Sequence, residues 1–384
     1  MKKKLHIIYI ITKLELGGAQ KVCLSLFKHI NTKNIVTHLI SGKKGPLVHE
    51  IQSCTHSYLL SSMERRISFF SFKELRNFIL VIKLLRSIKK KYHHCIVHTH
   101  STKAGLIGRW AAFFAGIHRR VHTVHGFGFH SYQNKIFWLI NFSLEWLTSF
   151  ITTHYICVSD HDLTIGTQCI PFFKKKSSLI RAAVYNEAFI PAIHTKNHLP
   201  FIFGTVACFK HQKNIFDLLR AFNKVHAEYP ETYLEIIGDG ILRPQYEQWI
   251  QAHALSTHIL LHGWHMHPQT IMQRWHAFTL TSLWEGLPCA IIEARLLKLP
   301  VLAYRVGGID EVIIPNRNGL LYQPKDWHNF AEGMKQLVTN HQLFNSLITY
   351  QDNLSSFTRN HMITQHIQLY KELANTKESK LLVH

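Results

Sequence analysis

The stretch SLWEGLPCAIIEA, residues 282–294, joins a strand pattern, AFTLTS, to a helix pattern. Pro288 stands where the first turn of the helix should begin, because a proline there loses only an amide that has no partner inside the helix. Gly286 lets the backbone come close to a ligand. The amides from Gly286 to Cys289 are then unpaired donors at a helix N-terminus, where the helix dipole adds positive potential. The stretch therefore predicts a diphosphate site.

Two glutamates, Glu285 and Glu293, lie at this predicted site. A carboxylate beside a phosphate repels it, so we expect both side chains to accept hydrogen bonds from hydroxyl groups, as the acidic residue of a dinucleotide fold does from ribose. A diphosphate flanked by two sets of hydroxyl groups describes a nucleotide sugar.

The spacing ExxxxxxxE, set within a serine, EGLP and EA, resembles the signature of the retaining glycosyltransferases of family 4. That family has the GT-B fold, an α/β architecture of two Rossmann-like domains facing each other across a cleft. The resemblance implies that Glu285, Gly286 and Leu287 line the donor site, with Glu285 on sugar hydroxyls and Glu293 on ribose.

Length and composition agree with a two-domain globular protein. The chain has 384 residues, 46% of them hydrophobic and 17% charged, and one domain rarely exceeds about 250–300 residues. No apolar run reaches the roughly 20 residues of a spanning helix. The nearest, IFWLINFSLEWLTSFI, is broken by Glu145 and predicts a buried or interfacial helix.

The N-terminus and the cysteines favour a cytoplasmic protein. MKKKLHIIYII has the basic head of a signal peptide, but it lacks a small-residue cleavage site and runs on into LELGGAQ, so we predict a first core strand. Seven cysteines without CxxC spacing indicate reduced thiols.

The positive charge is concentrated in the first half of the chain. Through residue 192 there are 27 Lys and Arg against 8 Asp and Glu, whereas the remainder has 17 against 15. Such asymmetry suggests a large anionic partner, either nucleic acid or the acidic face of a membrane, although a generally basic proteome would also produce it.

Two segments of this half bear on binding. Gly17 and Gly18 follow a strand pattern and open a helix pattern, which predicts either a Rossmann-like anion loop or a plain tight turn; the resemblance favours a loop that faces the cleft. Residues 69–91 predict an amphipathic helix. Its apolar face is expected in the core and its basic residues at lipid headgroups; the apolar positions are Phe72, Leu75, Ile79, Ile82 and Leu85.

Histidines mark the ends of two further strand patterns. Alternation puts His98 and His100 on one face near a strand's carboxyl end, and VHTVHGFGFH places His125 similarly. HTHxxKAGxxGR and HTVHGFxFH resemble runs in family 4 enzymes that build bacterial surface polysaccharides. The resemblance places His125 near the donor, as a catalytic residue, and assigns the acceptor side to His100, Ser101, Lys103 and Arg109.

Metal binding is the weaker interpretation of the polar clusters. The 30 histidines form pairs such as HxH at 98–100 and HxxHxH at 262–267, but no second cluster stands at zinc-site spacing. Asp160 and Asp162 form a DxD, a manganese motif in another glycosyltransferase fold; SDHD also has the SxxD form of a helix cap, which we favour. We expect no metal site and no cofactor beyond the donor.

The second domain begins near a new strand pattern at residue 201. We expect an acceptor-side domain over 1–192, a nucleotide-sugar domain over 193–365 and a helical tail over 366–384, which by resemblance packs back on the first domain. The linker AAVYNEAF departs from the family's GVDxxxF.

The loop after this strand carries Lys213, which matches a family lysine that neutralises the departing diphosphate. Cys208 stands where the family has an arginine, so Lys210 takes over its contact or activity is low or absent. Strands ending LEIIGDG and ILLHGWH resemble base-binding shelves, which makes Trp264 a candidate nucleobase contact.

The resulting expectation is a metal-independent, retaining transferase with Lys213, Glu285 and His125 as catalytic residues. It moves a hexose or N-acetylhexosamine from a nucleotide diphosphate sugar, expected to be UDP-linked, to a lipid-linked or lipopolysaccharide acceptor at the inner membrane face. Two alternatives are a GT-B nucleotide-sugar epimerase and a basic nucleic-acid-binding protein. EGLPCAIIEA favours transfer, and no zinc-finger or RNP-like motif supports nucleic acid.

Overall fold

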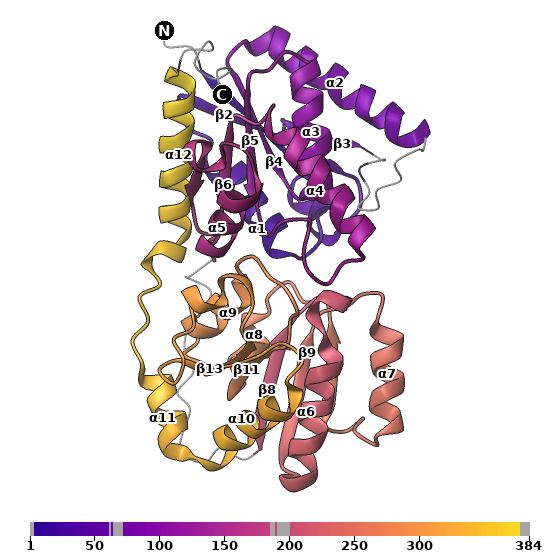
Figure 1. The fold of residues 1–384 in the computed structure, drawn as a ribbon, viewed down its shortest axis with the longest axis vertical. Coiled ribbons are helices and arrows are strands. Elements are labelled where there is room, and N and C mark those ends of the chain that lie inside the picture. Colours follow the sequence, from indigo (N-terminus) through magenta and orange to yellow (C-terminus); the bar gives the residue numbers. More distant parts are fainter. Residues whose placement is uncertain (1–3, 61–62, 64–71, 185–188, 190–199, 377–384) are drawn as a thin grey trace. The chain divides into compact units, whose positions relative to one another are not determined.

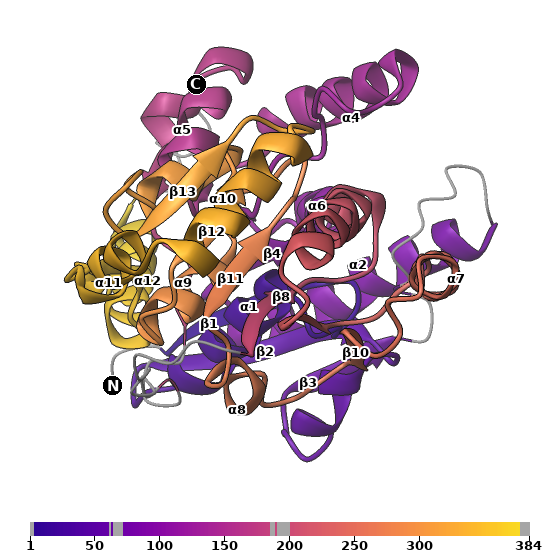
Figure 2. The same cartoon turned by 90° about the horizontal axis from the view of Figure 1, so that it is seen from below.

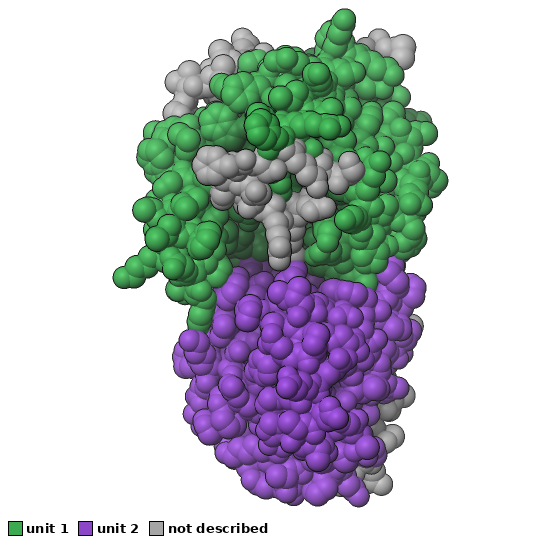
Figure 3. Space-filling view, turned by 90° about the vertical axis from the view of Figure 1, so that its right-hand side faces the viewer, with its two compact units in different colours: residues 1–183, 359–384 green, residues 184–358 purple. Residues whose placement is uncertain are grey.

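The computed structural model describes residues 4–60, 63, 72–184, 189 and 200–376. The chain forms two compact units, residues 1–183 with 359–384, and residues 184–358 (Figure 3). The boundary expected near residue 192 lies outside the described residues. The C-terminal helix belongs to unit 1 from residue 359, seven residues before the expected start of the tail at residue 366.

Unit 1 is a seven-stranded parallel sheet covered by helices (Figure 1). Its strand order is β3-β2-β1-β4-β5-β6-β7. Successive strands are therefore added on one side of β1 up to β3 and on the other side from β4 onward, so the order reverses between β1 and β4. The elements are β1 (Leu5–Ile10), α1 (Gly18–His29), β2 (Ile35–Gly42), η1 (Pro46–Glu50), β3 (Ser57–Leu60), α2 (Phe72–Tyr92), β4 (Cys95–His100), α3 (Thr102–Phe114), β5 (Arg119–Val124), α4 (Lys135–Ser149), β6 (His154–Cys157), α5 (Asp160–Cys169), η2 (Phe173–Lys176), β7 (Ser177–Leu179) and α12 (Arg359–Asn375).

Unit 2 repeats this plan with six parallel strands in the order β10-β9-β8-β11-β12-β13, reversing between β8 and β11. Its elements are β8 (Phe201–Val206), η4 (His211–Lys213), α6 (Ile215–Glu228), β9 (Thr232–Ile237), α7 (Arg243–Ala252), β10 (Ile259–Gly263), α8 (Gln269–Met272), β11 (Ala277–Leu280), α9 (Cys289–Leu296), β12 (Val301–Tyr304), η5 (Gly307–Glu311), β13 (Gly319–Tyr322), α10 (Trp327–Thr339), α11 (His341–Thr349) and η6 (Ser355–Phe357). Two Rossmann-like units are therefore confirmed.

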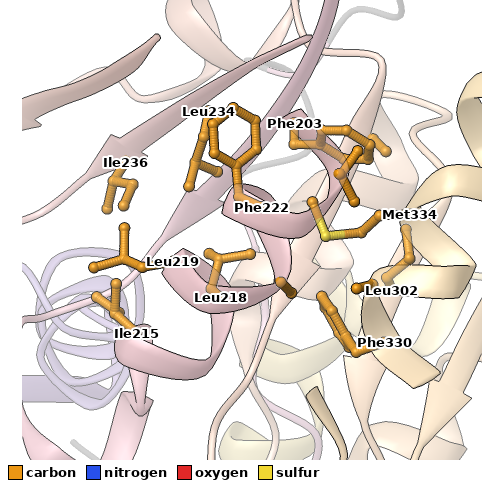
Figure 4. Close-up of a cluster of buried hydrophobic side chains, with 14 of the residues drawn as sticks. Phe203, Ile215, Leu218, Leu219, Phe222, Leu234, Ile236, Leu302, Phe330 and Met334 are labelled. Atoms are coloured by element: carbon orange, nitrogen blue, oxygen red, sulfur yellow. The ribbon is translucent and has the colours of Figure 1, made fainter. Parts of the chain in front are cut away.

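The core of unit 2 lies where α6 and α10 pack side by side on the sheet (Figures 1, 2 and 4). Leu218 and Phe222 of α6 meet Phe203 and Leu234 of the strands, and Phe330 of α10 closes the cluster. Strands buried in this way are nearly continuous in apolar residues, as parallel sheets require.

Local signals in the sequence account for several boundaries. The strands expected from residue 5 and from residue 201 are confirmed as β1 and β8. The Ser159 hydroxyl accepts from the amide of Asp162 at 3.0 Å and caps α5, which confirms the capping interpretation of SDHD. Pro288 is the N-cap of α9, with ψ of 106°, so the helix begins one residue later than predicted.

The prediction for residues 69–91 was wrong about the buried face. Residues 69–71 lie outside the described residues. Within α2, Phe72, Leu75 and Ile79 are exposed, although Leu85 is buried and Ile82 packs, partly buried, against the core as expected. The inward side chains are instead Asn77, Val81, Leu85 and Ile88. The apolar arc of this helix is wide enough to offer two alternative inward faces, and periodicity alone does not choose between them.

α12 is fixed to the sheet of unit 1 by a buried polar contact. The Tyr370 hydroxyl lies 3.0 Å from the Tyr9 hydroxyl and 2.5 Å from Nδ1 of His98. Nε2 of His98 in turn lies 2.7 Å from the Thr123 hydroxyl. This chain links the C-terminal helix to β1, β4 and β5.

We predict that Tyr370→Phe weakens this attachment. Removing the hydroxyl leaves buried partners on β1 and β4 unsatisfied, which costs about 1–3 kcal/mol. Local opening of α12 should then speed its amide hydrogen exchange by about 5- to 150-fold, measured by mass spectrometry.

Tyr246→Phe is the matched control, because the Tyr246 hydroxyl is buried without a hydrogen-bond partner among the described residues. Its removal should leave exchange in α7 unchanged or slower. Equal effects of the two substitutions would contradict the role assigned to Tyr370.

Candidate functional site

Two loops of unit 2 are hydrogen-bonded to each other at the point where the strand order reverses. β8 and β11 are neighbours, so the loops that follow them meet at the carboxyl edge of the sheet. The Leu283 amide donates to the carbonyl of Gln212 at 2.8 Å, and Nε2 of Gln212 donates to the carbonyl of Trp284 at 2.8 Å. The Thr281 hydroxyl donates to the carbonyl of Asn214 at 3.0 Å. These bonds fix the stretch that carries Glu285.

Lys213 and Glu285, one from each loop, form an ion pair. Their side chains are 15% and 8% exposed. Burial disfavours the ammonium form of Lys213, but the Glu285 carboxylate outweighs it and raises the pKa of Lys213; the thiols of Cys208 and Cys289 act in the same direction. The structure thus brings together two of the three predicted catalytic residues.

A third loop, after β12, holds the backbone at Glu285. The Gly308 amide donates to the carbonyl of Gly286 at 2.7 Å. Gly307 has φ of +58°, and a Cβ there would lie 2.1 Å from the carbonyl oxygen of Glu285. Only glycine fits, because both its conformation and this close approach exclude a side chain.

The N-terminus of α9 lies directly after these loops. Its N-cap is Pro288, which provides no side-chain hydrogen bond to the first turn. Gly286 and Leu287 are buried, and so is Glu293, at 5% exposure, in the second turn. The Ser282 hydroxyl is buried without a hydrogen-bond partner among the described residues. Amide donors, a cation and two carboxylates therefore gather at one edge of unit 2.

Trp264 follows β10, two strands away from β8 at the same carboxyl edge. It is 44% exposed. The glycine turns beside it are held together by the Gly238 amide, which donates to the carbonyl of Gly263 at 2.8 Å. A flat aromatic face at this edge suits a nucleobase.

Histidines from neighbouring strands meet in unit 1. Nδ1 of His100 lies 3.0 Å from Nε2 of His125, and the rings of His98 and His100 are 4.4 Å apart. Burial lowers the pKa of His125 to about 3 and that of His100 well below its ordinary value. Both imidazoles are therefore uncharged at neutral pH and act as hydrogen-bonding groups.

Gly17, Gly18 and Ser101 lie at the carboxyl ends of β1 and β4, where this sheet reverses. Gly17 is the N-cap of α1, without a side-chain capping bond. Ser101 has φ of +69°, and its hydroxyl lies 3.4 Å from that of Thr12. The structure thus brings the predicted glycine loop and the predicted acceptor-side serine to one edge of unit 1.

The side chains of Lys103 and Arg109 are buried and form ion pairs within unit 1. Nζ of Lys103, 6% exposed, lies 2.6 Å from Oε1 of Glu74. Arg109 is wholly buried and donates to both carboxylate oxygens of Glu145 at 2.7 Å. In this structure Arg109 has no surface from which to meet an acceptor, and its guanidinium holds α3 to α4.

Gln212 and Gly307 are site residues that the sequence did not single out. Their only signals were a polar residue beside Lys213 and a glycine pair after a strand. Among the described residues, no group of three or more His, Cys, Asp or Glu side chains is arranged to hold a metal ion. None of the described helices is long and apolar enough to span a membrane.

Comparison with known proteins gives matches over both units. Residues 16–181 match the model of "Glycosyltransferase Family 4", and residues 186–354 match that of "Glycosyl transferases group 1". The chain is 31% identical over 355 residues to an Escherichia coli UDP-Gal:alpha-D-GlcNAc-diphosphoundecaprenol alpha-1,3-galactosyltransferase, covering 89% of this chain and 90% of the relative.

Solved structures share the fold. HepE of Anabaena, in complex with UDP and glucose, superposes with a TM-score of 0.78 at 16% identity, over 96% of this chain and 100% of that one. Sucrose-phosphate synthase of Thermosynechococcus elongatus gives 0.79 at 17% identity, over 96% and 99%.

The buried Lys213–Glu285 pair leads to a prediction for stability. Lys213→Ala leaves a buried carboxylate without its cation and should destabilise unit 2 by about 3 kcal/mol. The double variant Lys213→Ala/Glu285→Gln removes both charges and should be less destabilised than the single variant. Urea-dependent hydrogen exchange of β8 and β11 measures both.

The matched control is the pair Lys224–Glu332, at 2.6 Å in the same unit with side chains 37% and 48% exposed. Exposed pairs contribute about 0–1 kcal/mol, so Lys224→Ala and Lys224→Ala/Glu332→Gln should differ little. Additive effects at the buried pair would show that the two groups are not coupled.

Proposed function

The chain belongs to the GT-B glycosyltransferases of family 4, which act on nucleotide sugars in polysaccharide and lipopolysaccharide synthesis, and from this premise we propose a UDP-dependent, retaining hexosyltransferase. Its acceptor is a sugar on a lipid diphosphate at the cytoplasmic face of the inner membrane. The observation that carries the proposal is the convergence of Lys213, Glu285 and the N-terminus of α9 at the reversal of the unit 2 sheet.

The donor fits this edge of unit 2 through five contacts. The diphosphate accepts from the first amides of α9 and from Lys213, and Glu293 accepts from ribose hydroxyls. Trp264 stacks on the uracil ring. The Lys213 ammonium is then shared between Glu285 and the phosphate, which frees a carboxylate oxygen of Glu285 for a sugar hydroxyl.

The charges that develop during transfer determine the role of each residue in the step. The bond from the anomeric carbon to the phosphate oxygen breaks, which leaves positive charge on the sugar and negative charge on UDP. Lys213 and the α9 amides stabilise the departing diphosphate, an electrostatic contribution of the kind that dominates many enzymes. The acceptor oxygen bonds to the anomeric carbon from the leaving-group side, and its proton passes to the departing phosphate. No metal is needed, because the protein supplies the neutralising charge.

Cys208 leaves the donor site with one cation fewer to neutralise the departing diphosphate. The family has an arginine at this position, whereas here the thiol raises the pKa of Lys213 and adds no cation. We propose that Lys213 therefore carries most of the stabilisation of the leaving group, so that its loss is more damaging here than in relatives that keep the arginine.

The acceptor side belongs to unit 1. The uncharged imidazoles of His100 and His125 are suited to hydrogen bonding with sugar hydroxyls. The strongly basic first half suits a lipid diphosphate at an anionic membrane. The name of the Escherichia coli relative, which includes UDP-Gal and diphosphoundecaprenol, supports UDP-galactose and a polyprenyl diphosphate sugar as the first substrates to test.

We predict that UDP binding stabilises the protein and that Glu293→Ala abolishes this effect. Ligand at about 100 times its dissociation constant adds about 2.7 kcal/mol, a clear rise in melting temperature by calorimetry. Glu228→Ala, at an exposed glutamate of α6, is the control and should keep the full shift. No shift with any nucleotide would mean that Cys208 marks a lost donor site, and salt-dependent binding of nucleic acid would then be tested.

We also predict transfer with retention of configuration. Purified protein with UDP-galactose and a lipid-diphosphate N-acetylhexosamine acceptor, with chelator present, should yield an α-linked product by proton NMR. Lys213→Ala should lower kcat by about a hundredfold or more, as loss of one leaving-group contact does. A β-linked product would refute retention, full inhibition by chelator would refute metal independence, and conversion of the donor without acceptor would indicate an epimerase.

A further inference from the structure

Helix α4 exposes its apolar side chains. At 3.6 residues per turn, six of the exposed apolar positions fall on one face about 120° wide, whose one polar member is Ser143, and the exposed Phe137 lies about 60° beyond its edge. The exposed fractions range from 38% at Ile140 to 68% at Ile136. We call this set the α4 face: Ile136, Leu139, Ile140, Trp146, Leu147 and the C-cap residue Phe150.

The opposite face of α4 points inward and combines polar groups with two partly buried rings, Trp138 and Phe142, which pack against Phe129. Glu145 is held by Arg109 and also accepts from the Tyr155 hydroxyl at 2.9 Å. Nε1 of Trp110 donates to the Thr148 hydroxyl at 3.0 Å. The surface helix of a globular protein normally turns its apolar stripe inward. Here the helix carries apolar side chains on both sides, and the buried ion pair lies on its inward side.

The neighbouring helices α3 and α2 also carry exposed apolar side chains. α3 contacts both α2 and α4, and the three helices lie in one region of unit 1 (Figure 1). Phe113 and Phe114, at the end of α3, are 42% and 50% exposed. The ring of Phe114 contacts that of Phe78 on α2, and Arg86 donates to the Phe114 carbonyl at 3.0 Å. The first half of α2 adds the exposed side chains of Phe72, Leu75, Ile79 and Leu80.

Cations accompany this surface. α2 contains seven Lys and Arg residues and a single acidic residue, Glu74. The only charged residue of α4 besides the buried Glu145 is Lys135. Exposed aromatic and aliphatic side chains together with basic residues are the composition of helices that lie in the interface of an anionic bilayer. A two-fold contact with a second copy would place cationic helices near each other, which disfavours that occupant.

We propose that the α4 face inserts into the surface of an anionic membrane, while the basic residues of α2 bind the headgroup phosphates. The inference deepens the proposed membrane association and rests on that part of the proposed function. It identifies α4 as the inserting element, whereas the sequence predicted lipid contacts from the basic residues of 69–91 and left α4 as either a buried or an interfacial helix. In the bound state the helix lies parallel to the membrane, with Trp146 at the level of the headgroups and upper acyl chains.

Vesicle flotation of the full chain tests the proposal. Wild-type protein should float with vesicles of phosphatidylcholine and phosphatidylglycerol at low salt, and less with phosphatidylcholine alone. Ile140→Glu/Leu147→Glu places two charges on the α4 face and should lower vesicle binding about tenfold or more. The control Leu260→Glu/Ile314→Glu makes the same change at exposed apolar residues of unit 2 and should bind like wild type.

A second measurement does not depend on a charged variant. Lipids brominated in the acyl chains should quench part of the tryptophan fluorescence on binding, and Trp146→Phe should remove most of that quenching. Arg76→Gln/Lys83→Gln should weaken binding to anionic vesicles several-fold and flatten its salt dependence, with neutral vesicles little affected.

Two results would overturn the proposal. One is equal vesicle binding by wild type and Ile140→Glu/Leu147→Glu, with the variant's circular dichroism unchanged. The other is a stable dimer in light scattering that this variant converts to a monomer, which would make the α4 face a subunit interface. The UDP-induced thermal shift is measured on the same samples without lipid, so a failure of the donor site and a failure of membrane insertion are distinguishable.

Discussion

Parallel pairing of β8 with β11 is the constraint on which the donor side depends. Strands distant in sequence become neighbours, so the loops after them meet at one edge. Gln212 and Thr281 then hydrogen-bond across the two loops, and Gly307 allows a third loop to approach Glu285. The Lys213–Glu285 pair is the result of this convergence. It keeps a cation and a carboxylate buried beside α9 without leaving either charge unpaired.

In unit 1 the strand order reverses in the same way, but the side chains gathered at this edge have different chemistry. Its edge collects histidines whose low pKa values keep them uncharged, whereas the edge of unit 2 collects charged groups. The difference follows from burial, since His100 is fully buried and pairs with no carboxylate among the residues that the structure describes. One fold therefore provides a hydrogen-bonding surface in one unit and an electrostatic one in the other.

Much of the fold could be predicted from sequence, because strand, glycine loop and helix recur with short spacings, and the stretch before α9 carries its own signals. The side-chain partners could not. Lys213 and Glu285 are 72 residues apart, and Arg109 and Glu145 are 36 apart. Nothing local shows that Arg109 turns inward. For α4, the sequence predicted a buried or interfacial helix, but it did not show which side chains would point inward, because Arg109, the partner of Glu145, lies far away in the sequence.

The Arg109–Glu145 pair has a cost that packing alone does not explain. Desolvating two charges often cancels their attraction, and apolar replacements of such pairs are frequently as stable. Here Glu145 keeps a pKa of about 2 despite burial, because Arg109 and the Tyr155 hydroxyl hold its ionised form. The inward side of α4 also carries Trp138 and Phe142, which pack against Phe129, so the ion pair acts together with these rings. The buried pair and these rings together determine which face of the helix points outward, and the pair adds a specific partner, Arg109, for that orientation.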